Sequence, residues 1–105
     1  QKNHKKAMKN INLALKYDPD NLDWHFNKAH ILYEKGEYDS ASKKFHNILG
    51  KADKKWLLRK SYYKLGLIEL YQKDTTQAIE HFYNSSKFGH TKADSIYNKL
   101  KHSGN

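Results

Sequence analysis

Histidine is the residue type in this sequence with the widest chemical reach, because an imidazole can bind a metal ion or move a proton near neutral pH. The chain has seven histidines and no cysteine. The histidines are His4, His25, His30, His46, His81, His90 and His102. No two of them stand four residues apart, the spacing that presents two imidazoles of one helix to one ion. The sequence therefore predicts surface histidines, with no metal site and no cofactor.

Catalytic patterns are equally hard to find in the sequence. Without cysteine there is no thiol nucleophile. No phosphate-binding glycine loop, nucleophilic serine elbow or zinc-protease helix motif occurs. Glu34 and Glu37, an acidic pair close in sequence, flank a predicted turn that solvent reaches. We expect that the chain is not an enzyme.

The charge balance is strongly basic. Lysine and arginine number 20 against 11 acidic residues, a formal net charge of +9, and the densest basic run lies between Lys51 and Lys64. Such a surface attracts acidic proteins and nucleic acids. Arg59 is the only arginine, and arginine is the residue that reads bases and phosphates with paired hydrogen bonds. With Trp56 and Tyr63 nearby, a nucleic-acid-associated module driven by charge and stacking stays an alternative.

The elements that must position these groups are helices throughout. Apolar residues recur at spacings of three and four, and no long stretch alternates as a strand would. The predicted helices cover about residues 2–17, 22–35, 38–49, 54–72, 76–88 and 92–101. Connections of two to five residues make consecutive helices antiparallel neighbours. No apolar run is long enough to span a membrane, and a chain without cysteine suits a reducing or an oxidising compartment equally.

Turn and cap residues set the expected helix ends. Asp20 or Asn21 can cap the second helix after Pro19. Gly50 is expected to close the third helix together with Lys51, since glycine often follows a helix end. We expect Asp53 to cap the fourth helix.

The helix pairs repeat one another. An alanine followed four residues later by a large apolar residue occurs at Ala7, at Ala41 and again at Ala78, at intervals of 34 and 37 residues. With the segments Tyr17–Asn21 (YDPDN) and Gly36–Ala41 (GEYDSA), this pattern resembles the tetratricopeptide repeat (TPR) family over nearly the whole chain. The resemblance is weaker at other positions, such as Glu69, where an aromatic residue is usual.

The resemblance implies an all-α, αα superhelical stack of antiparallel helix pairs, about two and a half repeats plus a C-terminal helix. The expected units are the second helix of a partial repeat (1–19), two repeats (22–50 and 53–88) and a capping helix (91–102). Small residues let paired helices approach closely, and Phe45 and Phe82 fill the gap to the next repeat. The small residues are Ala29, Ala41, Gly66 and Ala78.

The opening repeat lacks its first helix, so the chain is expected to be a fragment or a matured product of a longer repeat protein. The face of Met8, Ile11 and Leu15 would then lack part of its cover. A self-assembly unit that pairs this face with another copy is a second alternative.

In the resembled family, the first helices of each pair line a concave groove that holds a partner peptide. The residues expected on that groove are Phe26, Asn27, His30, Tyr33, Lys60, Tyr63, Lys64, Leu67 and Tyr71. Some co-chaperone members grip a C-terminal carboxylate, and Asn27, Lys60 and Lys64 fall on the later positions of that clamp, with Lys64 in place of an arginine. The prediction is a non-catalytic protein–protein interaction module, an adaptor, scaffold or regulatory domain, whose partner carries an acidic segment or C-terminal carboxylate.

Overall fold

The computed structural model describes residues 3–103 and consists, over that range, of six α-helices without a strand. The helices are α1 (His4–Tyr17), α2 (Leu22–Glu34), α3 (Tyr38–Lys51), α4 (Lys55–Tyr71), α5 (Thr75–Lys87) and α6 (Thr91–Ser103). The predicted all-α stack is confirmed, and each helix end lies within two residues of its predicted place. One predicted end, Lys2, lies outside the described residues.

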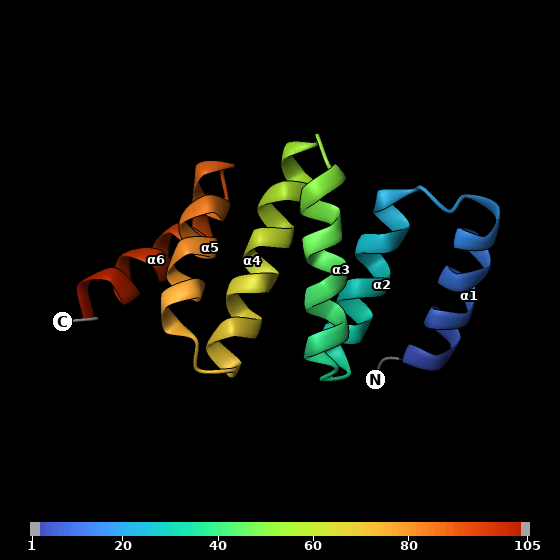
Figure 1. Ribbon diagram of the computed structural model, residues 1–105, viewed down its shortest axis with the longest axis horizontal. Coiled ribbons are helices and arrows are strands. Elements are labelled where there is room, and N and C mark those ends of the chain that lie inside the picture. Colours follow the sequence, from blue (N-terminus) through green and yellow to red (C-terminus); the bar gives the residue numbers. More distant parts are fainter. Residues whose placement is uncertain (1–2, 104–105) are drawn as a thin grey trace.

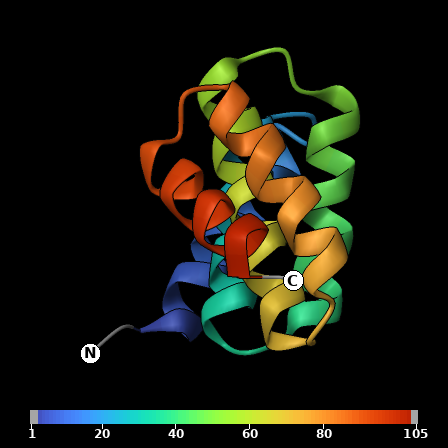
Figure 2. The same ribbon diagram turned by 90° about the vertical axis from the view of Figure 1, so that its left-hand side faces the viewer.

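Successive helices pack side by side and run alternately up and down (Figure 1). The row of helices follows the long axis of a molecule that measures 48 × 28 × 22 Å. Viewed from the α6 end, the helices overlap in a narrow stack and α6 lies obliquely across α5 (Figure 2). The result is an elongated solenoid in which each helix chiefly contacts its chain neighbours.

Small residues hold the helix pairs together, as the sequence predicts. Ala29, Ala41 and Ala78 have no solvent-exposed surface. Gly66 of α4 lies directly against the ring of Phe82 in α5, where an added Cβ would stand 2.7 Å from the ring atom Cε1. Position 66 therefore has no room for a side chain.

The apolar core forms two clusters along the stack. The larger cluster joins α2, α3 and α4 through Phe26, Ala29, Ala41, Phe45, Ile48, Leu57, Leu65 and Ile68. The smaller cluster joins α5 and α6, with α4 residues against it, through Ala78, Phe82 and Ala93. Leu57 is 1% exposed, while the adjacent Leu58 is only partly buried. The reason is that Leu57, Ser61 and Leu65 form one stripe at intervals of four.

The turn between α2 and α3 and the turn between α4 and α5 follow the same backbone path. Gly36 and Lys73 both have a positive φ, of 81° and 63°. The amide after each donates to a carbonyl five residues back, from Glu37 to Leu32 at 2.9 Å and from Asp74 to Glu69 at 2.8 Å. The longer interval before Ala78 arises because α4 has 17 residues where α2 has 13.

The predicted cap of α2 is confirmed, because the Asn21 side chain accepts from the amides of Asp23 and Trp24. The predicted roles of Gly50 and Asp53 at helix ends are wrong. Helix α3 runs through Gly50 and ends at Lys51, since Gly50 does not adopt the left-handed conformation that stops a helix. Asp53 stands one residue too early to cap α4, which starts after Lys54 without a side-chain cap.

The face of α1 that we expected to lack part of its cover is covered only in part. Ile11 is 6% exposed and is buried, while Met8 and Leu15 are partly buried. The exposed apolar residues of α1 are instead Leu13 and Tyr17. None of the helices in residues 3–103 has the length and apolar character needed to cross a bilayer.

Candidate functional site

A hollow of about 370 Å³ opens between α2, α4 and the start of α6. We call it the α2–α4 groove. Its lining residues are Phe26, Asn27, His30, Lys60, Tyr63, Lys64 and His90. All of these except His90 were predicted from the sequence as groove residues. They meet because α2 and α4 occupy the same place in successive helix pairs, so the same face of each helix turns to the same side of the stack.

The floor of the groove is continuous with the core. Phe26 is 8% exposed, and its ring meets the rings of Phe45 and Trp56 edge-on, at centroid distances of 5.6 and 5.9 Å. Such edge-to-face packing holds each ring in one orientation. Phe26 therefore presents a fixed apolar edge to the groove and is at the same time a packing residue.

Two ammonium groups stand over aromatic rings at the groove. Lys60 Nζ lies 5.8 Å from the centroid of the Trp56 ring, and Lys64 Nζ lies 4.6 Å from that of Tyr33. A ring face attracts a cation and limits the conformations of the long lysine side chain. Lys60 and Lys64 are one helical turn apart, so the groove holds two positive charges on one face of α4.

Tyr63 and His90 form the wall next to α6. Their rings are stacked at 4.2 Å between centroids and 19° between planes, and Tyr63 also packs edge-on against Phe82. His90 Nδ1 accepts a hydrogen bond from the amide of Ala93 at 3.1 Å and so caps α6. Only the imidazole without a proton on Nδ1 can make this bond.

The surroundings of His90 favour that neutral imidazole. Burial lowers the pKa of His90, and the charges of Arg59, Lys60, Lys92 and Lys64 lower it further. From the sequence, His90 was predicted only to be one of the surface histidines. Its place immediately before a predicted helix was the available signal of a capping role.

Three predicted groove residues lie outside the hollow. Tyr33, beneath Lys64, begins an aromatic row that passes through Tyr38 to the exposed Tyr71, with centroid distances of 5.7 and 5.0 Å. Burial, followed by the neighbouring Tyr71 and Tyr38 phenols, raises the pKa of Tyr33, so this phenol stays neutral at physiological pH. Leu67 packs against the α5–α6 cluster and contributes to the core.

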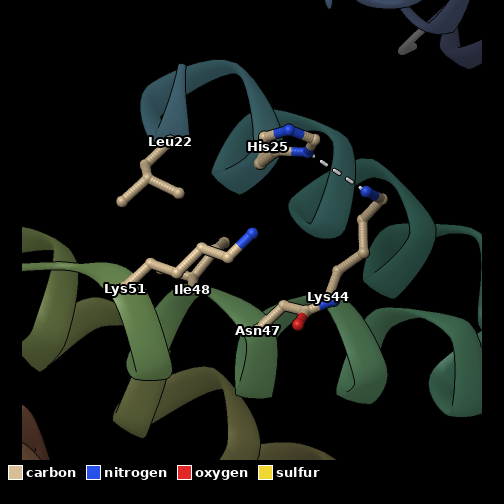
Figure 3. A pocket seen from close by; sticks show the side chains of 6 residues that line it. All are labelled: Leu22, His25, Lys44, Asn47, Ile48 and Lys51. Carbon is tan, nitrogen blue, oxygen red and sulfur yellow. Dashed lines mark hydrogen bonds between the residues drawn. The ribbon is translucent and has the colours of Figure 1, made fainter. Parts of the chain in front are cut away.

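A smaller pocket, of about 60 Å³, lies between α2 and α3 (Figure 3). There His25 Nε2 lies 2.7 Å from the Pro19 carbonyl oxygen and Nδ1 lies 3.2 Å from Lys44 Nζ. Because an ammonium group can only donate, Nδ1 accepts and Nε2–H donates to Pro19. Burial and the charge of Lys28 lower the pKa of Lys44. A pocket of this volume has room for only a few water molecules and for no larger ligand.

A third polar group was missed by the sequence analysis. His46, Glu69 and His81 come from α3, α4 and α5, and their ligand-type atoms all lie within 4.8 Å of one another. The search for helical spacings could not find this group, because its members are 23 and 12 residues apart and meet only through helix packing.

Comparison with known proteins adds no relative, since the chain matches no protein-family model and no curated protein. The resemblance to the tetratricopeptide repeat stays a prediction from the sequence pattern. What is established for the described residues is an all-α stack of helix pairs with a basic, aromatic groove on one side.

Proposed function

We propose that this chain is a non-catalytic protein–protein interaction module of the tetratricopeptide-repeat type, which holds a segment of a partner protein in the α2–α4 groove. The observation that carries the proposal is the joint presence there of a fixed aromatic edge and two ammonium groups one turn apart. Grooves of this character suit extended peptides. The partner segment is acidic, because the groove lining contains two lysines and no carboxylate.

Apolar contacts and charges both contribute to affinity in the groove. An exposed lysine–carboxylate pair contributes only about 0.2–1 kcal/mol. Burial of apolar surface contributes about 2.5 kcal/mol for each 100 Å² removed from water. Phe26 is only 8% exposed and has little surface left to bury, so the apolar part of the affinity comes mainly from Tyr63. Lys60 and Lys64 add to the affinity, orient an acidic segment and speed its association.

The test is selection from a displayed library of short random peptides with free C-termini. We expect wild-type protein to enrich aspartate- and glutamate-containing peptides. The variant Lys60→Glu/Lys64→Glu should bind a selected peptide at least about tenfold more weakly, which corresponds to the loss of two favourable charges and the gain of two unfavourable ones. Tyr63 is left intact, because its packing against Phe82 and His90 would confound the result.

The matched control is Lys9→Glu/Lys43→Glu, which makes the same change in net charge at two exposed positions outside the groove lining. Binding that survives in this control and fails in the groove variant supports the proposal. Equal losses in the two variants would mean that binding follows net charge alone. That outcome, with an affinity for any nucleic acid that falls steeply as salt rises, would support the charge-driven alternative instead.

A further inference from the structure

We propose that His46, Glu69 and His81 form a binding site for Zn²⁺ that links α3, α4 and α5. The three side chains offer ligand atoms within 4.8 Å of one another. The imidazole rings of His46 and His81 meet at 5.7 Å between centroids, with planes inclined by 62°. Two imidazoles and one carboxylate are a ligand set that zinc uses in proteins when a fourth position stays open to water.

The distances call for small movements of the side chains. Zinc holds imidazole nitrogen and carboxylate oxygen at about 2.0–2.2 Å, so tetrahedral ligand atoms lie about 3.3 Å apart. His81 Nδ1–H now donates a hydrogen bond to Glu69 Oε1, with 2.6 Å between the two atoms. When Zn²⁺ binds, it takes the place of this hydrogen, and the distance between the two atoms increases by somewhat less than 1 Å. His46 is exposed, so its ring can swing inward.

Burial distinguishes the Glu69–His81 pair from the more exposed ion pairs of residues 3–103. The side chains are only 13% and 10% exposed, and polar groups placed at such depth need strong partners. Glu69 occupies the same position before its turn as Leu32 does in the first helix pair, 37 residues earlier, because the carbonyl of each accepts the equivalent turn hydrogen bond. Packing at this position therefore does not require an acid. A buried carboxylate beside an imidazole, with a second imidazole at the solvent side, is the arrangement that a bound cation explains.

The site is independent of the α2–α4 groove, since none of its three residues lines that groove. It joins α3 of the first helix pair to α4 and α5 of the second. A metal at this point fixes how the two pairs stack, and its binding free energy adds to the stability of the stack. The exposed His46 also provides the entry path for the ion.

The experiment is calorimetric titration of ZnCl₂ into tag-free protein that has been dialysed against a chelator. We expect saturable 1:1 binding in the micromolar range and a melting temperature that rises with zinc concentration. His46→Ala removes one ligand at an exposed position and should weaken binding at least about tenfold, the scale seen when even an outer partner of a metal ligand is lost.

His102→Ala is the matched control, since it removes another exposed histidine on the last helix. Zinc binding that is unchanged in this control and weakened in His46→Ala supports the site. The proposal is overturned if wild-type protein shows no saturable binding in the micromolar range, or if His46→Ala binds zinc as tightly as wild type. Glu69→Gln gives a second check, because it keeps the shape of the side chain and loses the anionic ligand.

Discussion

The substitution Gly66→Ala tests how closely α4 and α5 approach. A Cβ at position 66 would lie 2.7, 2.8 and 2.9 Å from three ring atoms of Phe82. Ordinary contact between carbon atoms is about 3.5–4.0 Å, so the ring must retreat by roughly 1 Å. Phe82 has no exposed surface, and the surrounding core leaves little space for that retreat.

The expected magnitude follows from two opposing effects. Forcing an extra methyl group into a packed core costs about 1–3 kcal/mol. Alanine in place of glycine inside a helix gains about 0.5–1 kcal/mol. The central values leave a net loss of about 1 kcal/mol in the free energy of unfolding, which lowers the melting temperature by about 4–8 °C in a domain of this size.

Gly50→Ala is the control for the helix effect. Gly50 also lies within a helix, but an added Cβ there meets nothing within 4 Å. The free energy of unfolding of this variant should therefore be about 0.5–1 kcal/mol higher than that of wild type, and its melting temperature should also be higher. Urea denaturation followed by circular dichroism measures both variants, and their difference isolates the cost of overpacking.

The predicted result is that Gly66→Ala lowers the free energy of unfolding and Gly50→Ala raises it. If Gly66→Ala stabilised the protein as much as Gly50→Ala does, the close packing of α4 on Phe82 would be refuted. A double variant adds a direct check, because Phe82→Leu removes the ring atoms that the new methyl group meets. The two substitutions should then couple favourably, by at least about 0.5 kcal/mol.

Three further predictions concern single positions. Lys73 has a φ of 63° where the first pair has Gly36, so Lys73→Gly should raise the free energy of unfolding by about 0.5–1 kcal/mol in urea denaturation; a loss would contradict the positive φ. Ser85 and Ser61 are both fully buried, but of the two only Ser85 donates a hydrogen bond, to the Arg59 carbonyl. Thermal melts should therefore show that Ser85→Ala lowers the free energy of unfolding by about 1 kcal/mol and Ser61→Ala by less than half of that. Because the pKa of His90 is lowered in the folded protein, the unfolded chain binds more protons than the folded one just below the ordinary pKa of about 6.5. The stability due to neutral His90 is therefore complete above that pH and is lost as the pH falls below it. His90→Asn, which keeps a capping side chain, should flatten this decline in melts taken from pH 7.5 to 5, and an unchanged pH dependence would contradict the assignment.

The fold followed from sequence features that act locally. Apolar spacing and the break at Pro19 placed the helices, and the recurring alanines placed the close contacts between them. The errors arose where a local rule gave two answers. Gly50 could end a helix or lie within one, and in the structure it lies within α3. Asp53 could cap a helix that starts at residue 54, but α4 starts one residue later, at Lys55.

The candidate sites also differ in how much of each could be predicted from the sequence. Asn27, Lys60 and Lys64 were placed on one surface from helical periodicity and the family resemblance, and the structure brings them to one hollow. His90 joins them because the turn between α5 and α6 brings its ring against Tyr63 of α4. The group of His46, Glu69 and His81 depends on how three successive helices pack, so no spacing rule applied to one helix could reveal it.

The most direct test of the account is to map where a selected acidic peptide binds. Two-dimensional ¹H–¹⁵N NMR spectra of labelled protein, recorded during titration with the peptide, report on each backbone amide. The account predicts concentration-dependent shifts at Asn27, His30, Lys60 and Lys64, with little change at Lys43 and His46 on α3. Shifts that spread over the lysines of every helix, or that concentrate outside the α2–α4 groove, would contradict it.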